Sequence, residues 1–252
     1  MDGQARLRRI VETLQERDEV QVGALAEELG CSEMTVRRDL QALESSGALR
    51  RVHGGAVRGF LGAEEAPYDL RALEAADAKE AIGAVAAALL ADGETVVLDS
   101  GTTALHVARA LRPRRMTVMP LALRPIFELH DAPEIRLLVP GGEVRPTELS
   151  FVGDLTSNAF AELRFDTYVM SLCGFDVTAG VTVHHLAEAV VKRAAASASR
   201  RVIAVADASK IGRVAFGHIC DVGVVDVLIT DGEADEQAVE DLRRAGIDVR
   251  RA

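Results

Sequence analysis

The chain has 252 residues, of which 48% are hydrophobic, and its formal net charge at pH 7 is −10. This length suits one large core plus a small module, and no apolar run approaches the ~20 residues of a membrane span. The polar, arginine-rich start of the chain predicts no signal peptide. Cys31, Cys173 and Cys220 have no disulfide or zinc spacing. We therefore predict a cytoplasmic protein with no membrane association and no metal.

Three helices are predicted near the N-terminus. An arginine-rich helix has apolar residues at Leu7, Ile10, Val11 and Leu14, and residues 22–29 form a second, shorter apolar stripe. Gly30 provides the left-handed conformation that a tight turn between helices requires. Ser32 then caps a helix to about Leu43, which buries Val36, Leu40 and Leu43 and turns outward Met34, Arg37, Arg38 and Gln41. Two helices, a glycine turn and outward arginines are typical of a DNA-binding helix-turn-helix.

A short hairpin follows the third helix. Gly47 is expected to end that helix, residues 49–52 form a strand with Arg50 and Arg51, and His53 begins a tight turn before the chain resumes at Ala56. Such a wing places basic side chains along the phosphate backbone beside the groove. The alternative is that the arginines form an ordinary solvated face and the turn has no function.

The positive charge of the N-terminal region is concentrated in one stripe rather than spread over residues 1–58. Residues 1–58 contain nine arginines against ten acidic residues, a net charge of −1, and the rest of the chain carries −9. The arginines of the third helix and the wing nevertheless form a basic stripe, and no acid occurs from residue 45 to residue 62. Phosphate contacts require only such a stripe, while the acidic remainder limits non-specific adhesion to DNA.

The segment SEMTVRRDLQALESSGALRRVHGGA resembles the DNA-binding region of the DeoR family of bacterial transcriptional regulators. The resemblance implies a winged helix-turn-helix over residues 1–58 and an α/β effector-sensing domain over 77–252. Two glycines, a proline and a cluster of acids at 59–76 indicate a linker between them that passes into a helix. The residues expected to contact DNA are Ser32, Thr35, Arg37, Arg38, Gln41, Arg50, Arg51 and His53.

The rest of the sequence alternates strands and helices. After an alanine-rich helix at 79–90, short β-branched runs occur at 95–98, 116–119, 135–139, 167–172, 202–206, 225–230 and 247–249. Helical segments lie between most of them, at 103–111, 121–130, 154–163, 186–199 and 236–245. Runs without alternation are typical of strands buried on both faces. The fold class is therefore α/β with a largely parallel sheet, and ligands are expected at the carboxyl ends of its strands.

A phosphate site is expected directly after the first of these strands. Asp99-Ser100-Gly101-Thr102-Thr103 opens a helix, so amides, hydroxyls and the helix dipole would meet an anion there. The alternative is that Thr102 or Thr103 is an ordinary helix cap. Similar loops follow other strands, at 141–142, 174–176 and 207–210.

The same loops carry a second resemblance. LDSGTT, PGG, GFDVTAGVT, EAVVKRA and ADASKIG are similar to segments of DeoR-type sensor domains, whose fold resembles ribose-5-phosphate isomerase and which typically bind phosphorylated sugars. The implied effector-binding residues are Asp99, Gly101, Thr102, Thr103, Gly142, Asp176, Lys192, Asp207 and Lys210. One segment departs from the family: Met119-Pro120-Leu121 stands where Thr-Asn is usual, so the particular sugar is not carried over.

Two classes of function are compatible with these features. One is a DNA-binding repressor of sugar metabolism, acting as a homodimer or homotetramer and released from its operator by a sugar phosphate. The other is a phosphosugar isomerase or transferase, but such an enzyme has no use for a winged helix, so we favour the regulator and predict no enzymatic activity and no cofactor. His184, His185 and Glu188 could suggest a metal pair, but no third ligand accompanies them.

Overall fold

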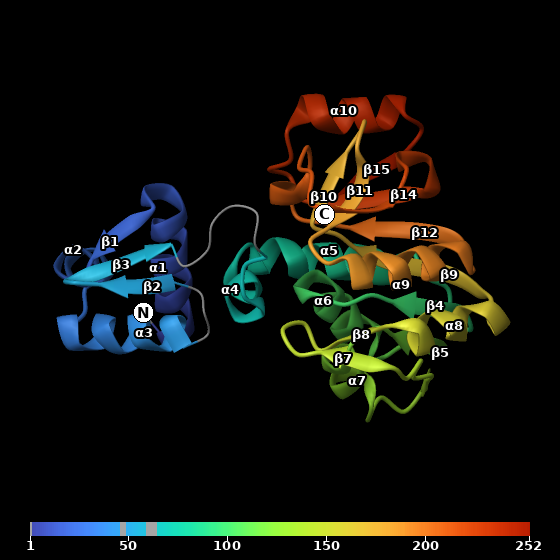
Figure 1. Cartoon of the computed structure of the whole chain (residues 1–252), viewed down its shortest axis with the longest axis horizontal. Coiled ribbons are helices and arrows are strands. Elements are labelled where there is room, and N and C mark those ends of the chain that lie inside the picture. The colour runs from blue at the N-terminus through green and yellow to red at the C-terminus, as the bar shows by residue number, and fades with distance from the viewer. Residues whose placement is uncertain (1, 46–48, 59–64) are drawn as a thin grey trace. The chain divides into compact units, whose positions relative to one another are not determined.

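The computed structural model describes residues 2–45, 49–58 and 65–252, and its contacts divide the chain into two compact units, Met1–Ala76 and Asp77–Ala252 (Figure 1). The expected helix end at Gly47 and the first part of the predicted linker, residues 59–64, lie outside the described residues. Each unit has its own hydrophobic core. The two units are therefore described separately.

The N-terminal unit contains a helix-turn-helix and a hairpin. Its elements are α1 (Gly3–Arg17), β1 (Glu19–Gln21), α2 (Val22–Leu29), α3 (Glu33–Ser45), β2 (Leu49–Val52), β3 (Gly55–Arg58) and α4 (Tyr68–Leu73). The three strands form an antiparallel sheet in the order β1-β3-β2. A Cβ atom at Gly55 would lie 2.0 Å from the carbonyl oxygen of Val20, so only glycine allows β3 to approach β1 this closely.

The turn between α2 and α3 forms as the sequence predicts. Gly30 has φ 61° at the end of α2, and the backbone N–H of Thr35 donates to the Ser32 hydroxyl at 3.2 Å, which caps α3. On α3, the side chains of Val36 and Leu40 are fully buried. The inward face of α3 is therefore committed to the core, and its outward face is available for a partner.

Helix α4 lies within the stretch that the sequence predicts as a linker. Tyr68 and Leu70 are buried, and Leu70 belongs to the same apolar cluster as Ile10 of α1. The guanidinium of Arg71 lies 5.7 Å from the centre of the Tyr68 ring. The last part of this stretch is therefore packed structure that belongs to the N-terminal unit.

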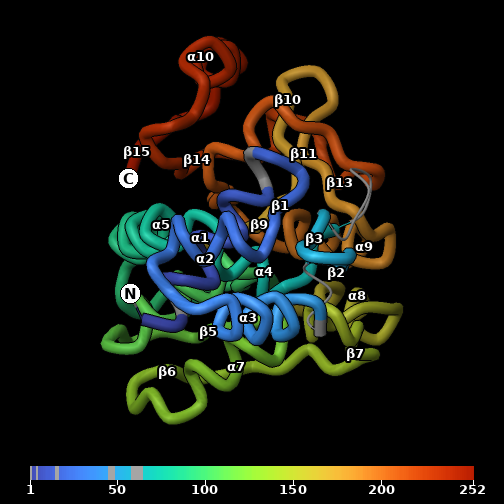
Figure 2. The backbone as a smooth tube through the Cα atoms, turned by 90° about the vertical axis from the view of Figure 1, so that its left-hand side faces the viewer, coloured from blue at the N-terminus to red at the C-terminus, as the bar shows by residue number. Residues whose placement is uncertain are grey.

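The C-terminal unit is built around a seven-stranded parallel sheet. The sheet has the order β15-β14-β12-β9-β4-β5-β6, and every pair in it is parallel. It runs from β15 beside α10 to β6 beside α7 (Figure 2). The strands are β4 (Thr95–Leu98), β5 (Met116–Pro120), β6 (Ile135–Leu137), β9 (Phe165–Ser171), β12 (Ser199–Val205), β14 (Val227–Thr230) and β15 (Asp248–Arg251).

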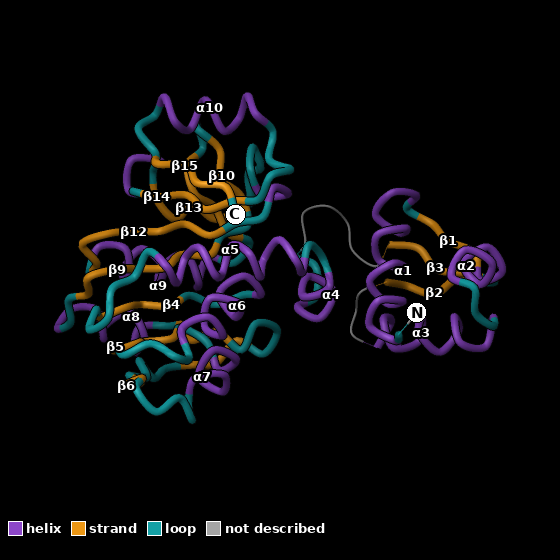
Figure 3. The backbone as a smooth tube through the Cα atoms, turned by 180° about the vertical axis from the view of Figure 1, so that it is seen from behind, coloured by secondary structure: helices purple, strands orange, loops and turns teal. Residues whose placement is uncertain are grey.

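Helices cover both faces of this sheet (Figure 3). They are α5 (Ala76–Ala88), α6 (Thr102–Leu111), α7 (Leu123–Leu129), α8 (Asp154–Glu162), α9 (Leu186–Ser197) and α10 (Glu236–Arg244). Successive strand residues enter opposite cores: Val97 packs with α8, α9 and α10, while Val96 and Leu98 pack with α5, α6 and α7. The central strands are buried on both faces, which explains why they show no polar alternation, whereas the edge strands β15 and β6 are more exposed.

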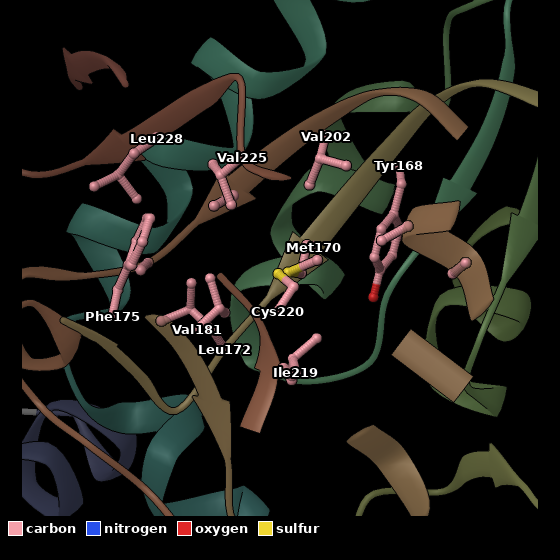
Figure 4. Packing of buried hydrophobic residues seen from close by; sticks show 14 of the residues in the cluster. Tyr168, Met170, Leu172, Phe175, Val181, Val202, Ile219, Cys220, Val225 and Leu228 are labelled. Carbon is pink, nitrogen blue, oxygen red and sulfur yellow. The ribbon is translucent and has the colours of Figure 1, made fainter. Parts of the chain in front are cut away.

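Two smaller strand pairings were not predicted from the sequence. The hairpin β7–β8 joins Glu143–Arg145 to Ser150–Val152, and β10 (Gly174–Asp176), β11 (Gly180–Val183) and β13 (Gly217–Cys220) form an antiparallel sheet. Figure 4 shows Phe175, Val181 and Ile219 of this small sheet packed with Tyr168 and Met170 of β9. The small sheet therefore belongs to the core on the α9 side of the large sheet.

The strand order contains a switch point between β4 and β9. From β4 the chain adds β5 and β6 on one side, then returns to place β9 on the other side of β4 and continues through β12, β14 and β15. At such a point the loops leave the sheet in opposite directions, and a crevice opens at the carboxyl ends of the strands. Asp99 follows β4 and Ser171 ends β9, so both residues lie at this crevice.

Candidate functional site

The outward face of α3 carries the residues predicted to contact DNA. Ser32 and Thr35 lie at the start of this helix, and their hydroxyl oxygens are 2.9 Å apart. The side chains of Arg37, Arg38 and Gln41 are exposed. The structure therefore gathers the five predicted helix residues on one surface.

The two arginines of α3 have different surroundings. The guanidinium of Arg37 donates to Glu33 at 2.9 Å, and both side chains are more than half exposed. Within the described part of the chain, Arg38 makes no hydrogen bond or ion pair. Arg38 is therefore the arginine that can reach a base edge without first giving up a carboxylate partner.

The wing arginines differ in the same way. The backbone N–H of Arg51 donates to a Glu44 carboxylate oxygen at 3.0 Å, and the two charged groups lie 3.9 Å apart. Arg50 is exposed and has no ion pair among the described residues. His53 is exposed in the turn between β2 and β3. These side chains extend from a two-stranded ribbon, which is suited to contacts with a phosphate backbone.

A buried ion pair lies at the switch point of the large sheet. The Lys192 ammonium on α9 donates to Asp99 Oδ2 at 2.7 Å, and the side chains are only 4% and 1% exposed. The same oxygen accepts from the Tyr168 hydroxyl at 2.7 Å and from the Ser171 backbone N–H at 2.9 Å. This pair joins β4, β9 and α9, three elements from different parts of the sequence.

The charges around Lys192 keep its ammonium protonated. Burial lowers the pKa of Lys192, but the negative charges of Asp99 and Glu188 outweigh burial, and the pKa stays above its ordinary value. Burial and the charge of Asp99 raise the pKa of Tyr168 well above its ordinary value. The Tyr168 hydroxyl therefore stays protonated and remains a hydrogen-bond donor at neutral pH.

A second buried ion pair connects the β7–β8 hairpin to α9. Arg145 donates to Glu188 Oε1 from Nε at 3.1 Å and from Nη2 at 3.0 Å, and the Ser150 hydroxyl donates to the same oxygen at 2.6 Å. Leu149, in the turn of the hairpin, has φ 56°, a conformation that costs a non-glycine residue roughly 1–2 kcal/mol. The hairpin is thus held against α9 in a strained conformation.

A small cavity lies between Glu188 of the second pair and the Asp99–Lys192 pair. Its volume is about 10 Å³, far below the ~300 Å³ at which ligand pockets usually begin. Its lining residues are Asp99, Ser100, Leu121, Ser150, Phe151, Glu188, Val191 and Lys192. The cavity wall that follows β5 is apolar because Leu121 lines it. This agrees with the segment Met119-Pro120-Leu121, which stands where Thr-Asn is usual in the family. A ligand of sugar size requires this cavity to open further.

The start of α6 borders the cavity at Ser100. Gly101, with φ 93°, is the N-cap residue of α6, and no side chain caps the helix. Thr102 and Thr103 form its first turn and are 6% and 7% exposed. The backbone N–H groups of a first turn have no partner within their own helix, so this helix start offers donors and a partial positive charge to an anion.

Asp207 and Lys210 lie at the carboxyl end of β12, one strand beyond β9. The carboxylate of Asp207 accepts hydrogen bonds from the backbone N–H and the hydroxyl of Ser209, and it lies 4.0 Å from the buried ammonium of Lys79. Burial raises the pKa of Asp207, but the charges of Lys210 and Lys79 outweigh burial and hold the pKa below its ordinary value. Neither Asp207 nor Lys210 lines the cavity.

Asp176 and Gly142 occupy positions with local structural roles. The Asp176 carboxylate accepts from the backbone N–H groups of Thr178 and Ala179, both at 2.8 Å, and closes the turn between β10 and β11. The segment 174–176, which the sequence predicts as a loop, is strand β10. Gly142 has φ 109° and lies against Thr156 of α8.

Gly142→Ala is expected to destabilise the fold irrespective of any ligand. The new Cβ atom would lie 2.1 Å from Thr156 Oγ1 and 3.0 Å from the Val152 carbonyl oxygen, in a backbone conformation that side chains rarely adopt. Overlap of this kind in a packed site typically costs about 1–3 kcal/mol. Urea unfolding of Gly142→Ala and of Gly141→Ala measures this; Gly141 has φ 74° but open space around its Cα. Equal losses in the two variants would contradict the steric role.

Several residues in and around the cavity are not predicted from the sequence. Glu188 was considered only as a metal ligand, and Arg145, Ser150, Tyr168 and Ser171 were not considered. Glu188 and Lys192 lie four residues apart on the buried face of α9, among Ala189 and Ala195. Charged residues are rarely buried without a partner, so these two positions within an apolar stripe of α9 were the feature of the sequence that could have indicated the site.

Two further features are absent from the described residues. No group of three or more His, Cys, Asp or Glu side chains within 2–45, 49–58 and 65–252 is placed to hold a metal ion. No helix in the described part of the chain combines the length and apolar character needed to cross a membrane.

Comparison with known proteins identifies both units. The DeoR-like helix-turn-helix domain matches residues 6–59, and the DeoR C terminal sensor domain matches residues 74–232. The HTH-type transcriptional regulator GolR of Listeria innocua is 32% identical over 97% of both chains. The lactose phosphotransferase system repressor of Staphylococcus epidermidis is 30% identical over 90% of this chain and 91% of its own.

Among solved structures, ribose 5-phosphate isomerase A from Methanocaldococcus jannaschii aligns with 54% of this chain and 55% of its own, at 17% identity and a TM-score of 0.40. The matched relatives of known class are transcriptional regulators and repressors, so the chain is a regulator rather than an enzyme. The winged helix-turn-helix at its N-terminus and the α/β unit that follows place the chain in the DeoR family of transcriptional regulators, as a DNA-binding protein with a C-terminal sensor domain.

Proposed function

We propose that this protein represses genes of sugar metabolism and leaves its operator when a phosphorylated sugar, or a similar metabolite, binds at the switch point. In this proposal residues 1–58 bind DNA, residues 59–76 connect the domains, and residues 77–252 sense the effector in a homodimer or homotetramer. The observation that carries the effector site is the uncapped start of α6 beside the buried Asp99–Lys192 pair. The named relative that represses a lactose system supports a sugar effector.

The two parts of a sugar phosphate match two parts of the site. The phosphate would accept from the first-turn N–H groups of α6 and from the hydroxyls of Thr102 and Thr103. The hydroxyls of the sugar would meet the carboxylate of Glu188 and the ammonium of Lys192, which line the cavity. Entry of the sugar would require the β7–β8 hairpin to separate from α9. The pocket residues farther along the sheet, Asp207 and Lys210, would contact only a longer effector.

Titration of an operator complex with effectors tests this function. An operator is selected from random double-stranded DNA, and its complex with the full chain is titrated with phosphorylated sugars and with the corresponding free sugars. At least one phosphorylated sugar should release the DNA and raise the melting temperature of the protein, while its free counterpart should do neither. Release by free sugars alone would contradict the phosphate site, and selection of no sequence would contradict operator binding.

Arg38→Ala and Arg50→Ala should weaken DNA binding in different ways. If Arg38 reads a guanine, its loss should cost about 1–3 kcal/mol and relax the base preference at one position. Loss of the phosphate contact of Arg50 should weaken binding to all sequences about equally and make the salt slope shallower by about one. Arg51→Ala should behave as Arg50→Ala does. Gel-shift titrations at several salt concentrations measure both effects. If Arg38→Ala folds and binds the operator with wild-type affinity, α3 does not lie in the major groove.

A further inference from the structure

Met34 is an unusual residue on the outward face of α3. Within the described part of the N-terminal unit it is the one large apolar side chain that is exposed, at 69%. It lies in the first turn of α3, four residues before Arg38 and seven before Gln41, so the three side chains form one stripe. The opposite stripe, Val36 and Leu40, is fully buried. Packing within the domain therefore does not account for Met34.

Two charged residues close to Met34 on α3 pair with each other. Glu33 and Arg37, its neighbours in the first turn and one turn on, pair with each other at 2.9 Å. The beginning of α3 therefore presents no net charge from this pair to the phosphates. In helix-turn-helix proteins the first residues of the second helix are the ones that contact base edges. An apolar side chain at that position is suited to the one apolar group in the major groove, the 5-methyl group of thymine.

We propose that Met34 reads a thymine methyl group in each half-site of the operator, one step along the groove from the base read by Arg38. The inference rests on the proposed placement of α3 in the major groove. The unbranched thioether adapts its shape and gains contact with the methyl group without requiring a hydrogen-bond partner. The Arg38 guanidinium, which has no partner among the described residues, would specify a neighbouring guanine. Met34 thus contributes sequence preference that no charge pattern reveals.

Deoxyuridine substitution tests this contact directly, because dU lacks only the 5-methyl group of dT. An operator is selected from random DNA with the full chain, and each dT of a half-site is replaced by dU in turn. Binding of wild type, Met34→Ala, Met34→Leu and Arg38→Ala to every probe is measured by fluorescence anisotropy. At one position wild type should lose about fourfold in affinity, the equivalent of one buried methyl group. Met34→Leu should still lose most of that fourfold affinity when dT is replaced by dU.

The comparison between variants decides the result. Met34→Ala should bind the dT and dU probes equally at that position, while Arg38→Ala should still distinguish them there and lose preference at a different base. The inference alone is overturned if an operator is selected but no dT position depends on Met34, or if Met34→Ala retains the fourfold difference. If the full chain selects no sequence at all, operator binding fails and this inference fails with it.

Discussion

Lys192→Met is expected to lower the free energy of unfolding of the sensor domain by about 3–5 kcal/mol, because it leaves the Asp99 carboxylate buried without its counter-charge. Asp99 is 1% exposed, and the Lys192 ammonium is one of three donors to its Oδ2 atom. The Tyr168 hydroxyl and the Ser171 N–H would remain, so the loss comes from the charge rather than from every hydrogen bond. Calorimetry or urea unfolding followed by circular dichroism measures it in the full chain.

A double substitution separates the charge from the shape. Asp99→Asn combined with Lys192→Met removes both charges at nearly constant volume, and it should recover much of the stability that the single variant loses. If the double variant is as unstable as the sum of the two single variants, the ion pair is not the cause. Lys192 would then stabilise the domain through packing of its aliphatic stem.

The pH dependence of this effect follows from the raised pKa of Lys192. A lysine whose pKa is higher in the folded state stabilises the fold fully below its unfolded pKa, about 10.4, and this contribution is lost as the pH rises through the folded value. The difference between wild type and Lys192→Met should therefore stay constant from about pH 6 to pH 9. It should shrink only in strongly alkaline solution. A decline between pH 6 and pH 9 would contradict the direction of the shift.

Local patterns were sufficient to predict much of the fold. Gly30 and Ser32 determine the turn and the cap of the helix-turn-helix through their own backbone and side-chain chemistry, and both behave in the structure as predicted. The seven strands of the large sheet were predicted because each coincides with a short apolar run rich in β-branched residues. Observed strand ends differ from the predicted ones by at most three residues, as with Phe165–Ser171 against the predicted 167–172, because the hydrogen-bonded ladder does not begin and end with the apolar pattern.

The contacts that build the cavity depend on the tertiary fold. Arg145 and Glu188 are 43 residues apart in sequence, and nothing near either residue indicates the other. Asp176 was expected in a loop at the carboxyl end of the fourth predicted strand, whereas the chain leaves the parallel sheet there and forms the separate β10–β11 hairpin. Strands this short, at three and four residues, carry too few side chains to establish a pattern.

Thr102→Asp is expected to produce a repressor that its effector does not release. Thr102 is the first residue of α6, where the proposed phosphate would sit. Two unit charges about 4 Å apart near a protein surface repel by roughly 4 kcal/mol, about a thousandfold in Kd. An aspartate in the first turn of a helix interacts favourably with the helix dipole, so the domain should still fold. DNA binding should persist because the winged helix has its own core.

Thr102→Asn is the matched control for this charge, because asparagine has nearly the same size and shape as aspartate without the negative charge. The effector found by titration of the wild-type operator complex is applied to complexes of all three proteins, and the concentration for half release is compared. Thr102→Asn should be released within about tenfold of the wild-type concentration, since it loses one hydroxyl contact, whereas Thr102→Asp should remain bound. Release of Thr102→Asp at the wild-type concentration would place the phosphate elsewhere than at the start of α6. If both variants resist release equally, the hydroxyl or the shape of Thr102 matters and the charge does not.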